Sequence, residues 1–577
     1  MKRIAYLVGA LLGGCFTASA QTAETDTTIT RNIEVVKEYN PVIREAGKIN
    51  TMPELKPINT KKITPNYSVW TSSFNPKADV IPSLDYALAS ENEENARITD
   101  HYIKLGVGNY TSFLGEGYTP IYKDSRYLID IYAKHLSSFG KVDLTPDLYP
   151  ALPSEIESDA RDNDTKVKAS LLRSYRQSEL SSFAGFGYNA FNYYGYDSFA
   201  QAAALNNESV YKGNKQAYTN FDLNLRYRTK DYVGKWKYDL QTNYQYFNNK
   251  TKVAESTIYT NLMGDYRMEA SSLRATLEMY NIFMSLPENV DIYDFENEEN
   301  AKSHTIIKIS PNYRFESSFG VFHIGVKGVF GLGQGRPGTI IPDIYGTIRL
   351  IDKKLYLYAG VTGDYQVNNY RQMTMLNQYI SPDIRVEDTY IPIDVYLGVK
   401  ANVAKKVNLD VYAGYKVINN PFFFVNKTIK KQAFNTFDVV YGKDAGLFNA
   451  GINTIYNWTE KLSLTLQTRY NAWSLDKIDK PWQMPTFELD FRTSYRITEY
   501  LRMELAYEFE GDRHASVGNE SVAMDNAHDI SLGASYSVLS FANVFLNLNN
   551  ILSQEYQNWY GYTAHRFNIM GGVSLNF

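Results

Sequence analysis

The chain has 577 residues, of which 44% are hydrophobic and 21% are charged, and aromatic side chains are abundant, with 48 Tyr, 29 Phe and 6 Trp. This composition excludes a disordered tail and a collagen-like polymer. Lys and Arg (59) nearly balance Asp and Glu (63), which argues against a partner that is a nucleic acid, because such a partner requires a basic face.

The first twenty residues are predicted to be an export signal peptide. They combine a positive start at 1–3, an apolar core at 4–14 and an Ala-Ser-Ala cleavage site at 18–20. Residues 12–15, Leu-Gly-Gly-Cys, are an alternative lipoprotein signal, but the cleavage site at 18–20 is the more complete motif. Cys15 is the single cysteine, so cleavage after residue 20 leaves no thiol for disulfides, nucleophilic catalysis or zinc binding.

Residues 21–100 differ in composition from the rest of the chain. They hold six of the nineteen prolines and only one glycine, and they end in an acidic stretch at 91–94. This composition predicts an extended periplasmic or lumenal segment with local turns. We expect it to fill the lumen of a barrel or to bind a periplasmic or outer-membrane protein partner; a disordered periplasmic tail is the alternative.

From residue 102 to the C-terminus, apolar residues alternate with polar ones. Between 501 and 509, for example, Leu501, Met503 and Leu505 alternate with Arg502 and Glu504. A period of two indicates strands, and an apolar and aromatic face opposite a face that carries charged residues is typical of strands that line a membrane barrel. No run of about 18 apolar residues follows the signal, which excludes helical membrane spans.

The links between these strands alternate in length. Short turns are expected near Ser271, Ser317, Asp352–Lys353, Lys405, Thr459–Glu460, Glu499 and Ser540. Long links are expected at 285–302, 331–340, 368–387, 419–445, 474–484, 513–527 and 551–564. This sorting is typical of outer-membrane barrels, which have periplasmic turns and extracellular loops. We therefore predict an all-β fold: a transmembrane antiparallel β-barrel of about 22 strands (20–22) over residues 101–577.

Two details leave the strand count open. Residues 435–441 could form an additional strand, and Pro311 is poorly suited to the interior of the strand expected at 303–316, because proline lacks an N–H group.

The C-terminal strand carries a predicted barrel-assembly signal. Its apolar face ends in a terminal aromatic residue and consists of Phe567, Ile569, Val573, Leu575 and Phe577, with Gly571 between them. Such a strand resembles the signal that the barrel-assembly machinery recognises, so lipid of the outer membrane and that machinery are the expected partners.

Two stretches resemble the TonB-dependent receptor family, whose barrels have 22 strands. Residues 106–112, Gly-Val-Gly-Asn-Tyr-Thr-Ser, look like the turn between the first two strands, and residues 548–577 look like the closing loop and last strand. The resemblance implies receptor or uptake activity at the outer membrane. Residues 26–29 or 33–36 could serve as an energy-coupling box. The resemblance covers 102–577 and does not extend to a plug domain, so it indicates a compact subfamily without a standard plug.

No catalytic, cofactor-binding or metal-binding residue is predicted. Gly333 to Gly338 match G-x-G-x-x-G, but Pro337 interrupts the turn and a strand follows where a dinucleotide site needs a helix. The seven histidines are scattered. The acidic loop at 291–299 fits no defined calcium-binding spacing and is read as solvated. An enzyme is therefore not expected.

Aromatic residues near strand ends have two interpretations. Tyr193, Tyr194, Tyr196, Trp473, Trp482 and Trp559 are expected in the girdles at the membrane interfaces. Phe422, Phe423 and Phe424 lie within a long link and are the predicted ligand-stacking loop. Three functions remain open: solute uptake or receptor activity, a scaffold or accessory subunit of an outer-membrane protein assembly or export complex, and an outer-membrane enzyme.

Overall fold

The computed structural model describes residues 101–145, 156–195, 214–287, 303–333, 338–351, 354–403, 406–428, 435–518 and 520–577. The chain divides into two units, Met1–Asn66 and Tyr67–Phe577, and all described residues belong to the second. The predicted signal peptide, the segment 21–100 with its coupling boxes and the acidic loop at 291–299 lie outside the described residues.

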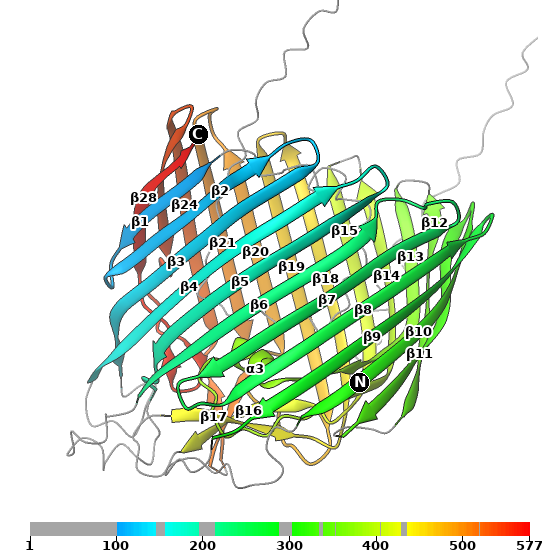
Figure 1. Cartoon of the computed structure of the whole chain (residues 1–577). Coiled ribbons are helices and arrows are strands. Elements are labelled where there is room, and N and C mark those ends of the chain that lie inside the picture. Colours follow the sequence, from blue (N-terminus) through cyan, green and yellow to red (C-terminus); the bar gives the residue numbers. More distant parts are fainter. Residues whose placement is uncertain are drawn as a thin grey trace, which may run out of the picture. The chain divides into compact units, whose positions relative to one another are not determined.

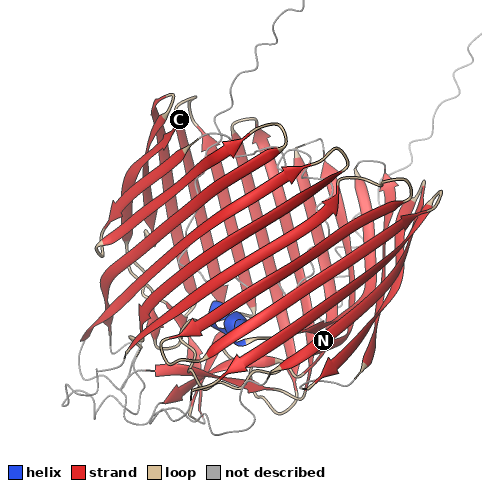
Figure 2. Cartoon of the chain, viewed as in Figure 1, coloured by secondary structure: helices blue, strands red, loops and turns tan. Residues whose placement is uncertain are grey.

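Twenty-two strands form one closed antiparallel sheet, which confirms the predicted barrel (Figures 1 and 2). Each strand pairs with its neighbours in chain order, and β1 closes the sheet by pairing with β28 from Tyr102↔Asn576 to Gly108↔Met570. The barrel strands are β1 (Tyr102–Gly108), β2 (Ser112–Lys123), β3 (Tyr127–Leu144), β4 (Ile156–Ser174), β5 (Ser178–Asn192), β6 (Lys215–Thr229), β7 (Trp236–Asn249), β8 (Ala254–Arg267), β9 (Ser271–Ser285), β10 (His304–Ser317), β11 (Gly320–Leu332), β12 (Thr339–Ile351), β13 (Leu355–Gln366), β14 (Thr389–Val403), β15 (Val407–Asn419), β18 (Asp444–Thr459), β19 (Leu462–Leu475), β20 (Phe487–Arg496), β21 (Leu501–Gly511), β24 (Ala527–Leu539), β25 (Ala542–Asn549) and β28 (Asn568–Asn576).

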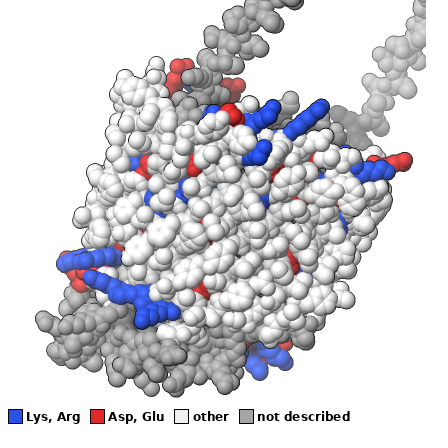
Figure 3. All heavy atoms as spheres, in the orientation of Figure 1, with Lys and Arg blue, Asp and Glu red and all other residues white. Residues whose placement is uncertain are grey.

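Alternation along each strand sorts side chains between the lumen and the outer face. In β1, Lys104 is buried on the lumen side, whereas Leu105 and Val107 are exposed on the outside. Figure 3 shows the result: charged side chains gather toward the two ends of the barrel, and a broad band between them is almost free of charge. An apolar outer band of this kind is the surface that a barrel presents to lipid.

The two ends of the barrel differ in their connections. At one end, which we call the short-turn end, described strands are joined by brief turns; the longest lies between Thr229 and Trp236. At the other end, the long-loop end, most links are much longer, and the one between Gln366 and Thr389 holds a helix. The exceptions between described strands are the hairpin β1–β2, the link between β7 and β8 and the link between Leu332 and Thr339, which are short.

The structure resolves both uncertainties in the strand count. Residues 435–441 form a strand, β17 (Asn435–Tyr441), but it pairs with β16 (Phe422–Thr428) outside the barrel. Pro311 lies within β10, and the register between β10 and β11 passes from Ile309 directly to Asn312. The missing N–H of proline is therefore accommodated where the ladder toward β11 is interrupted.

The two stretches that resemble the receptor family meet at the closing seam. Asn109, in the turn between β1 and β2, donates a hydrogen bond from its side chain to the carbonyl of Phe567 and accepts one from the N–H of Ile569 (2.8 and 3.0 Å). Tyr110 in the same turn packs against the ring of His565, with ring centroids 4.3 Å apart. The turn thus fixes the register of the last strand against the first.

Candidate functional site

The long links fold into additional structure over the long-loop end. β17, β16, β22 (Arg513–Val517) and β23 (Glu520–Met524) form a four-stranded sheet, and β26 (Gln557–Trp559) pairs with β27 (Tyr562–Thr563). α3 (Tyr370–Leu376) lies in the link between β13 and β14. Among the described residues, no helix is long and apolar enough to cross a membrane. We call the described parts of links 367–388, 420–443, 512–526 and 550–567 the loop cap.

One part of the loop cap, which we call the crossing segment (367–388), bridges the lumen. It leaves β13 and returns to β14, yet Arg371 forms two hydrogen bonds with Asp222 of β6 (2.6 and 2.9 Å). The backbone N–H of Tyr370 donates to Glu255 of β8 (2.7 Å), and Asn249 of β7 donates to the Tyr370 hydroxyl (3.2 Å). Because β6 to β8 lie several strands away from β13 around the barrel, these contacts require the segment to span the opening.

Local sequence explains the helix at this point. Asn369 caps α3 in an extended conformation, and its side chain accepts a hydrogen bond from the N–H of Gln372 (2.7 Å). Glu255, which is 2% exposed, places a carboxylate beside the N-terminus of α3, where negative charge is favourable. Asp222 lies seven residues into β6 from the long-loop end of the strand. The contact between Arg371 and Asp222 therefore lies roughly 20 Å along the tilted strand from that end.

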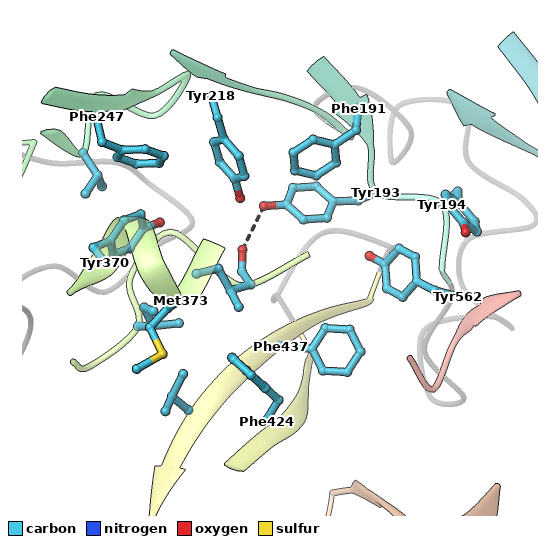
Figure 4. Close-up of a cluster of buried hydrophobic side chains, with 14 of the residues drawn as sticks. Phe191, Tyr193, Tyr194, Tyr218, Phe247, Tyr370, Met373, Phe424, Phe437 and Tyr562 are labelled. Atoms are coloured by element: carbon cyan, nitrogen blue, oxygen red, sulfur yellow. Dashed lines mark hydrogen bonds between the residues drawn. The ribbon is translucent and has the colours of Figure 1, made fainter. Parts of the chain in front are cut away.

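An aromatic core holds the crossing segment in place (Figure 4). The Tyr193 hydroxyl, after β5, donates to the carbonyl of Ile380 (3.0 Å), and the Tyr218 hydroxyl of β6 donates to Gln378 (2.7 Å). Tyr379 stacks on Tyr562 of β27. The buried members of this core are Val142, Leu144, Ala160, Phe191, Tyr193, Tyr194, Tyr218, Phe247, Val253, Tyr370, Met373, Ile380, Ile384, Val386, Phe424, Phe437, Val439 and Tyr562. Links from opposite sides of the barrel thus share one packed cluster.

The predicted ligand-stacking loop lies inside the cap. Phe422, Phe423 and Phe424 are on β16, and Phe423 and Phe424 are only 1% and 5% exposed. Their rings contact Trp473 (5.4 Å) and Trp559 (5.2 Å). A role in ligand stacking stays a prediction, and it requires the cap to open because these faces are covered.

The prediction of an aromatic girdle at the membrane interfaces is wrong for several of its residues. Tyr193, Tyr194 and Trp482 are 2%, 9% and 8% exposed. Trp559 also packs against the aromatic core. They are buried because the long links fold onto one another, which hides their aromatic residues from lipid. Tyr196 lies outside the described residues.

The predicted assembly signal lies on the outer face of β28. Phe567, Ile569, Val573 and Phe577 are exposed, and Leu575 is partly buried. The glycine-rich stretch at 333–338 connects two strands: Gly333 follows β11 with φ +96°, and β12 begins just after Gly338. In the ranges that the structure describes, no three His, Cys, Asp or Glu side chains gather in a way that could hold a metal ion.

The residues that fasten the crossing segment are absent from the sequence-based expectations. Arg371 and Asp222 are 149 positions apart, and Glu255 is 115 positions from Tyr370. Asp222 and Glu255 follow the same alternation as every other lumen residue, so nothing in the pattern distinguishes them. The available signal for α3 was Asn369, a residue type that favours helix N-caps, followed by the run Tyr-Arg-Gln-Met-Thr-Met-Leu.

The comparisons with known proteins show the fold. No protein-family model and no curated protein matches the chain. Solved structures do match the chain. One is the siderophore receptor PirA from Acinetobacter baumannii, with a TM-score of 0.63 and 10% sequence identity, where the match covers 83% of this chain and 80% of that chain. The ferric enterobactin receptor PfeA from Pseudomonas aeruginosa (0.62, 10%, 83% and 81%) and the iron transporter FrpB from Neisseria meningitidis (0.64, 9%, 83% and 81%) are also similar.

The closed barrel and its apolar outer band define an integral outer-membrane β-barrel protein. Its barrel is of the 22-stranded type found in TonB-dependent receptors, which confirms the expected resemblance at the level of the fold. The similar structures are receptors and transporters according to their names.

Proposed function

We propose that this chain is an outer-membrane receptor that captures a solute at its long-loop end and takes it up through the barrel. The proposal includes a movement, in which the crossing segment breaks its contacts with β6 to β8 and so opens the lumen. The names of the similar structures, which include siderophore, iron and copper proteins, support uptake as the class of function. The kind of solute does not follow from them, since the identities are near 10%.

The observation that carries the proposal is the way in which the crossing segment is held. Its deepest contact is the ion pair between Arg371 and Asp222, whose side chains are 14% and 23% exposed. Polar contacts of this kind can be exchanged for water, and the movement also requires apolar residues of the segment, such as Met373 and Ile380, to leave the aromatic core. Loss of this partly buried pair should cost the closed position roughly 1–3 kcal/mol. The ratio of open to closed protein should then rise about 5- to 150-fold.

Replacement of the arginine tests this movement. Arg371→Ala should increase the conductance of the purified full chain in planar bilayers and make cells more sensitive to a large hydrophilic antibiotic. Arg385→Ala is the matched control, because it removes an arginine of the same link that pairs locally, with Glu387. Equal conductance and equal antibiotic sensitivity of the wild type, Arg371→Ala and Arg385→Ala would show that the crossing segment does not act as a gate.

A second function, as a scaffold in an outer-membrane assembly or export complex, is favoured by the hairpin of β3 and β4. At its long-loop end the outer face carries ion pairs, Lys141 with Glu157 and Arg161 with Asp159, in place of apolar residues. A charged outer face suits water or a protein partner better than lipid.

Isolation of the native protein in mild detergent, with and without the substitution Lys141→Glu, tests the scaffold function. Partners that the wild type retains and the variant loses would support it. Residues 21–100 are the other proposed docking segment.

A further inference from the structure

Three turns at the short-turn end join into one positively charged rim. They connect β2 to β3, β4 to β5 and β6 to β7. Backbone hydrogen bonds tie each turn to the next, since the N–H of Ser174 donates to the carbonyl of Arg126 (2.6 Å) and that of Lys230 donates to Gln177 (2.9 Å). Lys and Arg side chains at this end are visible in Figure 3. The members of this cationic rim are all exposed, and they are Lys123, Arg126, Arg173, Arg176, Lys230 and Lys235.

The cationic rim has a surplus of positive charge. Its three turns contain only two carboxylates, Asp124 and Asp231. Asp124 accepts hydrogen bonds from the backbone of its own turn (2.6 and 2.7 Å), and Asp231 accepts one from the N–H of the residue that follows it (2.7 Å). No described carboxylate forms an ion pair with Arg173 or Arg176. The rim therefore attracts an anion from outside the described chain.

Arg173 lies on the outer face, beside the middle turn. It pairs across strands with Tyr127, and it alternates outward along β4 with Val167, which is 40% exposed. Its guanidinium carbon is 5.1 Å from the ring centre of Tyr127 and 4.6 Å from that of Tyr175. Aromatic faces attract a cation but do not use its N–H donors as a carboxylate does. The Arg173 side chain forms no hydrogen bond with any described residue, so these donors are available to a ligand.

The outer face next to the cationic rim is apolar. On β4, Val167 and Leu171 face outward between Arg173 and the middle of the strand. On β6, Leu225 and Tyr227 are 49% and 39% exposed. Lipid chains cover a band of this kind, and tyrosines at its edge lie at the level of the lipid headgroups. The Arg173 guanidinium is therefore at the height of lipid phosphates.

We propose that the cationic rim binds the phosphate of an anionic phospholipid, with Arg173 as the main donor of hydrogen bonds. A guanidinium matches the oxygens of a phosphate in a bidentate manner, and the acyl chains would lie against the apolar outer face. A zwitterionic lipid carries the same phosphate with a fixed positive charge, which the surplus charge of the rim repels. On the expected topology, the bound lipid belongs to the periplasmic leaflet. The proposal goes beyond the uptake function and does not rest on it, because this lipid stays outside the lumen.

Native mass spectrometry of the purified full chain tests the proposal. The protein is released from micelles that contain equal amounts of phosphatidylglycerol and phosphatidylcholine with identical acyl chains. The wild type should retain phosphatidylglycerol preferentially, and the preference should fall as the ionic strength rises. Arg173→Ala should lower the affinity for phosphatidylglycerol about fivefold, which is the scale of one cation at an anionic lipid surface. Arg173→Lys should restore part of it, because the charge returns without the bidentate geometry.

Arg349→Ala is the matched control. Arg349 lies at the same end of the barrel, but it alternates with the exposed Leu350, so it faces the lumen, where it pairs with Glu316 (3.3 Å). Its loss removes the same charge without changing the outer face, and the retention of phosphatidylglycerol should stay that of the wild type. Heat-modifiable migration in gels reports whether each variant folds.

A further arm separates the lipid from free phosphate. Inorganic phosphate should displace no more phosphatidylglycerol than chloride does at the same ionic strength, because the acyl chains contribute to binding. Equal retention of the two lipids by the wild type, unchanged retention in Arg173→Ala, or an equal loss in Arg173→Ala and Arg349→Ala would overturn the proposal. Specific displacement by inorganic phosphate would overturn it as well, since a soluble anion would then be the ligand.

Discussion

His565 is a residue whose setting links protonation to the closing seam. It lies in the link before β28, its ring packs on Tyr110, and its Nδ1 is buried without a hydrogen-bond partner in the described structure. Burial lowers the pKa of His565 to about 4 from an ordinary value near 6.5. The folded seam therefore holds this imidazole neutral, whereas the unfolded chain protonates it at mildly acidic pH.

This difference predicts a loss of stability in acid. The contribution of His565 is complete above about pH 6.5 and is lost as the pH falls toward 4, because the unfolded chain then binds a proton that the folded chain excludes. The loss should reach about 2–3 kcal/mol. Denaturant unfolding in micelles at pH 7 and pH 4.5 measures it, and His565→Phe should lower the pH dependence. An identical slope in the variant would contradict this assignment.

Leu505 tests the outer face at the level of one side chain. It lies in the middle of β21 and is 37% exposed, facing away from the lumen. Leu505→Arg should lower the free energy of unfolding in lipid by about 2–4 kcal/mol, the cost of a cation near the bilayer midplane. Ala506→Ser is the comparison, because the neighbouring residue faces the lumen and a small hydroxyl there should have little effect. A similar loss in both variants would argue against this orientation of the strand.

At the scale of the element, β28 has to close the barrel against β1 and β25 at once. Its backbone lies very near β1: a Cβ at Gly572 would be 2.0 Å from the carbonyl oxygen of Leu105. Phe577 follows the strand, is 61% exposed, and exchanges backbone hydrogen bonds with His101 (2.7 and 2.9 Å). The terminal residue thus belongs to the seam as well as to the predicted assembly signal.

Removal of that aromatic end should impair insertion. Phe577→Asp is expected to lower the amount of heat-modifiable, membrane-inserted protein. The reason is that the assembly machinery has to recognise the last strand, which then has to pair with β1. Phe541→Asp provides the control: Phe541 is an exposed aromatic (48%) in the adjacent turn and accepts a hydrogen bond from the backbone of Asn576. Equal insertion of the wild type and Phe577→Asp would show that the signal lies elsewhere.

At the scale of the whole barrel, the two ends are expected to face different compartments. The long-loop end should be extracellular, as in outer-membrane barrels generally, and the short-turn end periplasmic. Asp479, in the link between β19 and β20, and Glu499, in the turn between β20 and β21, are both exposed. Cysteine at 479 should react with an impermeant maleimide on intact cells, and cysteine at 499 should react only after lysis. The reverse pattern would invert the topology.

The sequence by itself determined the barrel. Alternation such as that around Leu505 is a local property, because each residue of a strand faces either lipid or lumen according to its position alone. The short turns and long links then set the number of strands. The closing motifs were visible for the same reason, since Asn109 and Phe567 each lie in a short stretch with its own pattern.

Only the tertiary structure decided how the long-loop end is built. The crossing segment joins Arg371 to Asp222, and the aromatic core joins Tyr193 to Ile380, between parts of the chain that no local period relates. Phe423 and Phe424 read as exposed aromatic residues in a loop, yet packing with distant links buries them. Strand periodicity reports which face a residue occupies, whereas contacts between links depend on where the closed barrel brings them together.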